Sequence, residues 1–234
     1  MKRCYKVAVL IDGAFFLKRY TKVFPAGQTH SAKVVAKNLH DFALKHVGRN
    51  HDLYRIYYYD CRPLQKRFHS PVSNAIIDFH KDQRSVFRNE LFEELKRQRK
   101  LALRLGHLKE NGNWLIDPRL TKALLSGKLT PQQLRENDVR LELRQKGVDM
   151  KIGVDIATLA YKKLVDRIVL VAGDADFVPA SKLARVEGID FILDPLWNPI
   201  DDRLLEHVDG IRSALPNPGF VIKDGFEEQL REAS

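Results

Sequence analysis

The stretch Val165–Val178, VDRIVLVAGDADFV, constrains the fold more than any other part of the chain. Its apolar run at residues 168–172 is typical of a strand buried on both faces, as in a parallel sheet. Gly173 ends the run, and two carboxylates follow at Asp174 and Asp176. Ligands bind at the carboxyl ends of the strands in open α/β sheets. Because two neighbouring acids raise each other's cost of ionisation unless a cation lies nearby, the pattern predicts a divalent metal site.

Two further runs end in the same way. Residues Lys6–Asp12, KVAVLID, read as a short buried strand that ends in an acid before Gly13 and a helical pattern. A helix N-cap would explain Asp12 alone, but two strands with the same ending favour a shared site. Residues Leu53–Asp60, LYRIYYYD, predict a third strand. We expect Asp60 to act first as a capping or supporting residue, and as a metal ligand only second.

A helix with two candidate acids precedes the Val165–Val178 stretch. Apolar residues between positions 152 and 164 have helical spacing, with Asp149 near the expected start and Asp155 within the pattern. Residues six apart do not share one face of a helix, so only one of the two acids is expected to bind a metal directly. A later helix start near Asp155, which Gly153 makes conceivable, would change that. The sequence leaves this choice open.

The chain is basic, and its charge is concentrated in one segment. The 234 residues carry a formal net charge of +10, which suggests a polyanionic partner. Between Arg62 and Lys109 there are 12 basic and 5 acidic residues, so this segment supplies most of the excess. A solvated surface is the alternative explanation, but beside an acidic centre we favour a guide for a phosphate backbone. Arg62, Arg97 and Lys100 are its candidate contacts.

The chain length fits one large α/β domain with insertions, or one domain with a small appendage. We place the domain at residues 1–210 and a C-terminal tail at 211–234. Residues 101–105 alternate as a strand that ends near Gly106, and Asn111-Gly112-Asn113 has turn chemistry. We interpret residues 111–137 as an insertion, helical and looped, that could cover the acidic edge of the sheet.

Other classes of protein are poorly supported. The absence of an apolar run near 18 residues argues against a membrane span, and the N-terminus has no small-residue cleavage site, so we expect a cytoplasmic protein. Cys4 and Cys61 lack the spacing of metal ligands. Glycine-rich phosphate loops, zinc-binding histidine patterns and the GxSxG elbow are also missing from the sequence.

Several motifs together resemble a known family. They are VLIDG at 9–13, KGVD at 146–149, VDIATLAY at 154–161, VAGDADFVP at 171–179 and ARVEGIDFIL at 184–193. In this order and spacing they look like the NYN domain, and more narrowly the LabA-like branch of the PIN-like nuclease superfamily. The resemblance implies a Rossmann-like, three-layer α/β/α sandwich with a mainly parallel sheet. It also implies an acidic pocket that binds Mg²⁺ or Mn²⁺ and cleavage of RNA phosphodiester bonds.

The resemblance also assigns residues. The acids that match the family's positions are Asp12 in the first strand, Asp149 and Asp155 in the helix region, and Asp174 with Asp176 after the later strand. The chain departs from the family where Ala14-Phe15-Phe16 replaces a stretch that often holds a polar residue, and where Ala172 replaces the usual serine. These departures keep a second hypothesis open, in which the protein binds RNA as a regulatory module and turns over little.

The chemistry of a phosphodiesterase agrees with this set of acids. Mg²⁺ prefers carboxylates and water as ligands, so an aspartate cluster suits it without histidine or cysteine. We expect Asp12 and Asp174 to ligate a metal directly, and Asp176 to complete the cluster. Either Asp149 or Asp155 would hold a second metal or position the attacking water. Lys146 and Lys151 could contact phosphate, or could be solvated surface lysines. The expected partner is RNA, single-stranded or structured, with DNA as a weaker possibility and no prediction of oligomeric state.

Overall fold

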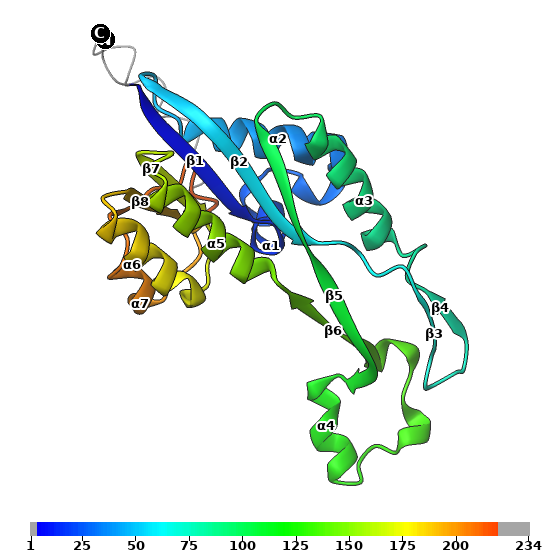
Figure 1. The fold of residues 1–234 in the computed structure, drawn as a ribbon. Coiled ribbons are helices and arrows are strands. Elements are labelled where there is room, and N and C mark those ends of the chain that lie inside the picture. Colours follow the sequence, from blue (N-terminus) through cyan, green and yellow to red (C-terminus); the bar gives the residue numbers. More distant parts are fainter. Residues whose placement is uncertain (1–3, 220–234) are drawn as a thin grey trace, which may run out of the picture.

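The computed structural model describes residues 4–219 (Figure 1). Within this range one seven-stranded sheet has the strand order β6-β5-β2-β1-β7-β8-β9. Its strands are β1 (Tyr5–Asp12), β2 (His51–Cys61), β5 (Leu101–Ile116), β6 (Val139–Lys146), β7 (Arg167–Val171), β8 (Asp190–Asp194) and β9 (Gly210–Ile211). The helices are α1 (Gly13–Val23), α2 (Ala32–Lys45), α3 (Gln83–Lys96), α4 (Pro118–Leu125), α5 (Val148–Tyr161), α6 (Val178–Val186) and α7 (Asp202–Leu205). A separate hairpin pairs β3 (Arg67–His69) with β4 (Ile76–Asp78).

The two strands whose endings suggested a common site are neighbours at the centre of the sheet. β1 pairs in parallel with β2 on one side and with β7 on the other. Residues 7–11 of β1 and 168–171 of β7 are buried, as expected for strands covered on both faces. The mainly parallel α/β sheet predicted from the sequence is therefore confirmed, with β6 as its antiparallel edge strand.

Helices cover both faces of the sheet and make the α/β/α sandwich (Figure 1). The core on one face joins α1, α2 and α3 to the sheet, and the core on the other joins α5 and α6 to it. From β1 the chain first builds outward to β2 and β5, and later returns to build β7 and β8 on the other side of β1. The boundary between β1 and β7 is thus the point where the topology reverses, which is where open α/β sheets form their ligand crevice.

The start of α5 settles a point that the sequence left open. Gly147 precedes the helix with a φ of 81°, a left-handed conformation that suits glycine, and the helix begins at Val148. Asp149 therefore lies in the first turn, and Asp155 lies inside the helix.

Beyond the sandwich, β5 and β6 continue as a long two-stranded arm that carries α4 near its tip (Figure 1). The predicted strand end at Gly106 is wrong, because β5 exchanges β2 for β6 as its partner there and continues to Ile116. The Asn111-Gly112-Asn113 segment is an irregularity within β5 rather than the expected turn, since pairing shifts between Glu110 and Trp114. Contacts with the β3–β4 region support the arm: Lys66 pairs with Glu110, and the Ser70 hydroxyl donates to Glu136 at 2.9 Å.

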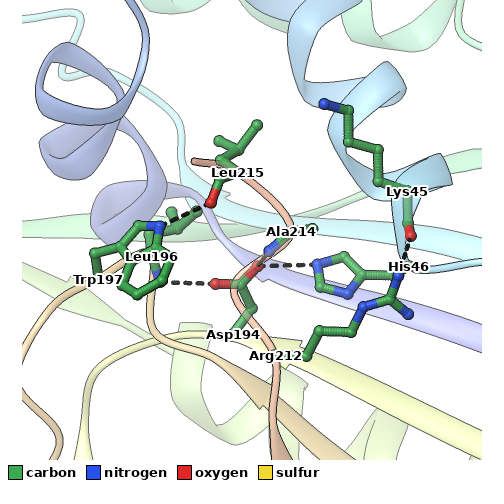
Figure 2. Close-up of polar contacts among 8 residues, drawn as sticks. All are labelled: Lys45, His46, Asp194, Leu196, Trp197, Arg212, Ala214 and Leu215. Atoms are coloured by element: carbon green, nitrogen blue, oxygen red, sulfur yellow. Dashed lines mark hydrogen bonds and ion pairs between the residues drawn. The ribbon is translucent and has the colours of Figure 1, made fainter. Parts of the chain in front are cut away.

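A buried polar cluster fastens the last described segment to α2 (Figure 2). Asp194 ends β8 and His46 follows α2, and both side chains are fully buried. His46 Nε2 lies 3.0 Å from Asp194 Oδ2, and the same carboxylate accepts the backbone N–H groups of Leu196 at 2.8 Å and Ala214 at 3.0 Å. The Arg212 guanidinium donates to the Lys45 carbonyl at 2.9 Å. The carboxylate of Asp194 is thus satisfied by three donors.

The predicted tail at 211–234 overlaps this segment. Ile211 belongs to β9 and pairs with β8, while residues 220–234 lie outside the described range. None of the helices within residues 4–219 combines the length and the apolar composition that crossing a membrane would require.

Candidate active site

Asp12 stands at the centre of the site, at the junction of β1 and α1. Its carboxylate caps α1 by accepting the Phe15 N–H at 3.1 Å. Burial raises the pKa of Asp12 to about 6, and the negative charges of Asp149 and Asp60 add to the rise. The backbone N–H groups of Phe15 and Ala14 oppose that rise. Asp12 is therefore both the N-cap of α1 and a carboxylate whose charged form is disfavoured by burial.

Asp174 and Asp176 follow β7, next to Asp12 in the sheet. Asp174 begins a short 3₁₀ helix, Ala175–Phe177, and accepts the Asp176 N–H at 3.1 Å. Both side chains are exposed. Glycine at position 173 leaves room for the Phe15 ring, because a Cβ there would stand 2.5 Å from that ring. The Phe15 ring thus occupies space beside the acids, at a position where the sequence comparison anticipated a polar group.

Asp149 reaches the same cluster from α5, although its side chain is exposed. Partial burial raises its pKa, and the charges of Asp174 and Asp176 raise it further. Within residues 4–219, neither Asp12 nor Asp149 forms an ion pair. The structure therefore brings four of the five predicted acids into one electrostatic group: Asp12, Asp149, Asp174 and Asp176.

The structure places the fifth acid, Asp155, elsewhere. Its Oδ2 accepts the Tyr59 hydroxyl at 2.8 Å and the Arg104 Nε at 2.9 Å. The Arg104 guanidinium also lies over the Tyr57 ring, 5.0 Å from its centre. Because α5 starts at Val148, Asp155 lies almost two turns along the helix and faces β2 and β5 instead of the acid group.

Asp60, at the end of β2, is held by hydrogen bonds to its own neighbours. Its buried carboxylate accepts Arg88 at 2.7 Å, the Cys61 N–H at 2.7 Å and the Tyr58 hydroxyl at 3.3 Å. Burial raises the pKa of Asp60, while Arg88 opposes the rise. With its oxygens occupied in this way, Asp60 fits the supporting role that was ranked first.

A cleft of about 550 Å³ opens over the acids and carries basic groups on its walls. Its acidic lining includes Asp12, Asp174 and Asp176, and its basic lining includes Lys18, Lys22, Arg19 and Arg203. A second hollow of about 830 Å³ shares Ala14 and Lys18 with this cleft and extends toward α3. The arrangement can hold a cation against the acids while the lysines meet an anion.

These basic residues on the cleft walls were not among the predicted site residues. Lys18 and Lys22 lie one and two helical turns after Ala14 on α1, and this spacing of four along the helix that follows the strand-end acid was the available signal. Arg203 comes from α7 and pairs with Asp201 at 2.8 Å, and Asp176 and Asp174 further raise its pKa. Its approach to the acids depends on the loop after β8, which no pattern in the sequence predicted.

The five predicted phosphate contacts are spread over the molecule. Lys146 and Lys151 are exposed on either side of Asp149, and Arg62 follows the carboxyl end of β2. Arg97 and Lys100, by contrast, lie between α3 and the amino end of β5. These two therefore stand at the opposite end of the strands from the acids, with Arg97 paired to Glu94 at 2.8 Å.

The donor chemistry of the acid group fits a hard divalent cation. Four carboxylates on three chain segments repel one another, and oxygen donors of this kind are the ligands that Mg²⁺ takes. As the side chains stand, no group of three or more His, Cys, Asp or Glu within residues 4–219 is arranged to enclose a metal ion. A cation here would therefore keep several waters, as Mg²⁺ commonly does.

Comparisons with known proteins identify the family of the chain. The sequence matches the NYN domain family over residues 6–195, a range that contains all four clustered acids. No curated protein matches the chain. Among solved structures, a protein of unknown function from Vibrio parahaemolyticus is similar, with a TM-score of 0.46 and 11% identity over 92% of this chain and 98% of that one. The match over most of the chain shows that this protein belongs to the NYN domain family, within the PIN-like nuclease superfamily.

Proposed function

We propose that the protein is a metal-dependent endoribonuclease that hydrolyses RNA phosphodiester bonds at the acid group, with Mg²⁺ or Mn²⁺ as its cofactor. The observation that carries the proposal is the convergence of Asp12, Asp149, Asp174 and Asp176 at the point where the sheet topology reverses. Repulsion among these carboxylates destabilises the folded protein unless a cation binds them, so we take the cluster as the mark of a cation-binding site. Membership of a nuclease superfamily supports the same conclusion.

Each part of the cleft has a task in this proposal. Asp12 and Asp174 hold the cation, and Asp176 completes its surroundings. Asp149 is exposed beside these acids, and its carboxylate accepts the proton of the attacking water. When bound, the metal neutralises charge on the scissile phosphate and lowers the pKa of water. Asp155 is left out of this set because its carboxylate is held by Arg104 and Tyr59.

Basic residues around the acids bind the flanking phosphates. Lys18 and Lys22 line the cleft on α1, and Lys146 and Lys151 flank Asp149. Phosphate contacts fix the position of the substrate without reading its bases, so RNA of many sequences could enter. A cytoplasmic location, predicted from the sequence, is consistent with such a substrate.

A cleavage assay tests the proposal. Purified protein is incubated with labelled single-stranded RNA in Mn²⁺, Mg²⁺ or EDTA, beside an Asp174→Asn variant and an Asp41→Asn control on the exposed face of α2. We expect cleavage that needs the metal, is abolished by Asp174→Asn and is kept by Asp41→Asn. Activity that survives Asp174→Asn would contradict the site.

The Phe15 ring beside the acids favours one second candidate, an RNA-binding module with little turnover. RNA that binds in a salt-sensitive manner but stays intact with every metal would establish this alternative instead. The salt dependence identifies binding through phosphates, since counterions are released when lysine and arginine neutralise the backbone.

A further inference from the structure

The β5–β6 arm has two chemically different faces. Residues directly opposite in an antiparallel pair lie on the same side, and alternate residues along each strand share that side. One face carries the apolar pairs, including Trp114 opposite Leu141 and Ile116 opposite Val139. It also carries Glu110, through which the β3–β4 region contacts the arm.

The other face is basic, and we name it the basic ribbon face. It places His107 opposite Lys146 and Lys109 opposite Arg144, with Arg140 further along β6. All five side chains are exposed. Like charges directly opposite each other destabilise a strand pair, so the facing of Lys109 and Arg144 lowers the stability of the arm, and the Glu142–Arg144 ion pair acts against this effect. A polyanion lying along the face would relieve that repulsion.

The position of the basic ribbon face ties it to the candidate active site. β6 runs from the tip back toward the sandwich and ends at Lys146, three residues before Asp149 (Figure 1). At the same level, β5 leaves β2 at Gly106, beside the carboxyl edge of the sheet. The ten residues from His107 to Ile116 extend roughly 30 Å at the usual rise of a strand. The face is therefore a basic track that leads away from the acids.

We propose that the basic ribbon face binds the phosphate backbone of the RNA substrate beyond the cleaved bond, so that the arm favours long RNA over short oligonucleotides. The inference rests on the proposed function for the identity of the polyanion. Its support is charge complementarity, the placement of Lys109 opposite Arg144 and continuity with the acidic cleft. The sole acid on this face of β6, Glu142, pairs with Arg144 at 2.5 Å and so competes with phosphate for it.

Binding measured without cleavage tests the arm separately from the nuclease proposal. The probe is a fluorescein-labelled single-stranded RNA of about 24 nucleotides, titrated in EDTA at several salt concentrations, a length chosen to exceed the roughly 30 Å arm. The test variant combines Lys109→Gln, Arg140→Gln and Arg144→Gln. The matched control combines Lys33→Gln, Lys37→Gln and Lys45→Gln on α2, which removes the same charge from exposed positions away from the arm.

We expect the test variant to raise the Kd about tenfold or more, and to lower the slope of log K against log salt by about 2, at ~0.7 per lost phosphate contact. The control should change the Kd by less than about threefold. A single Glu142→Gln variant should tighten binding, because it frees Arg144. Equal losses in the test and control variants would show that binding follows net charge alone and would overturn the proposal, as would an unchanged Kd.

Folding of the variants and catalysis are controlled independently. Thermal unfolding should show the test variant close to the wild type in stability, because it removes both the facing like charges and the exposed Glu142–Arg144 ion pair, which act in opposite directions. RNA that binds through the arm yet is never cut would refute the nuclease proposal and keep this one. RNA that is cut as fast by the test variant as by the wild type, at low RNA concentration, would refute the arm and keep the nuclease.

Discussion

Two carboxylates end parallel strands of this sheet and have opposite surroundings. Asp194 at the end of β8 is fully buried, and His46 and two backbone N–H groups satisfy it (Figure 2). Asp12 at the end of β1 is also largely buried. Within residues 4–219 its carboxylate interacts with backbone N–H groups and with other acids, and not with a basic side chain. Asp194 therefore stabilises the fold, whereas the charged form of Asp12 destabilises it unless a ligand binds.

The difference lies in partners that come from distant parts of the chain. Asp194 obtains His46 from the end of α2, 148 residues earlier, and Asp60 obtains Arg88 from α3. Asp60 ends β2, which is as close to the centre of the sheet as β7, so the partner and not the position in the sheet decides the difference. A strand-end aspartate thus becomes part of the structure where a basic group reaches it, and part of a site where other acids reach it.

The largest expected effect comes from removing the hydrogen-bonded carboxylate of Asp194. Asp194→Ala removes the acceptor of His46, Leu196 and Ala214 together, so we expect the free energy of unfolding to fall by about 3–5 kcal/mol. Urea unfolding followed by circular dichroism measures this loss. A loss below about 1 kcal/mol would show that the cluster does not fasten the C-terminal segment to α2.

The next effect is the binding of a metal to the acid group around Asp12, and measuring it does not require catalysis. Mn²⁺ at about 100 times its Kd should stabilise the folded protein by about 2.7 kcal/mol, because it binds the native acid group. Asp174→Asn should abolish this stabilisation, while Asp41→Asn should keep it. Thermal unfolding with and without Mn²⁺ provides the measurement. Equal stabilisation of both variants would mean that the metal binds somewhere else.

A smaller and opposite change in stability is expected at Asp12. Its pKa is raised to about 6, so the folded protein holds this proton more tightly than the unfolded chain. The stabilisation is present below about pH 4 and is lost as the pH rises through 6. In EDTA, Asp12→Asn should therefore be more stable than the wild type by about 1–2 kcal/mol near pH 8, and equal to it near pH 4. Urea unfolding at both pH values tests this, and a destabilised variant at pH 8 would contradict it.

The sequence was most informative where the pattern is local. The apolar runs of β1 and β7 predicted buried parallel strands, and their acidic endings predicted Asp12 and Asp174 as neighbours. It was less informative where a partner from another segment decides the outcome. Periodicity placed Asp149 and Asp155 on one helix, but the helix start at Gly147 and the donors Arg104 and Tyr59 are known only from the fold.

The arm shows the same limit on a larger scale. The Gly106 break and the Asn111-Gly112-Asn113 segment predicted the end of a strand, since the hydrophobic pattern stops there. The backbone instead continues by pairing with β6, and that pairing depends on residues from 23 positions later, for Ile116 with Val139, to 39 positions later, for His107 with Lys146. Alternation along one strand could not reveal that Lys109 faces Arg144, because the register belongs to both strands.

The smallest expected change in stability is at Asp155, and the rate of cleavage separates it from Asp149, the other acid of α5. Asp149 belongs to the acid group, whereas the Asp155 carboxylate is held by Arg104 and Tyr59. Asp149→Asn should lower the rate of RNA cleavage by about 100-fold, the scale of a lost catalytic acid or base. Asp155→Asn should change that rate by less than about threefold and cost roughly 1 kcal/mol of stability, through its weakened ion pair. The reverse order of the two rates would place Asp155 among the metal-binding acids and Asp149 outside them, and it would require α5 to turn or shift when the metal binds.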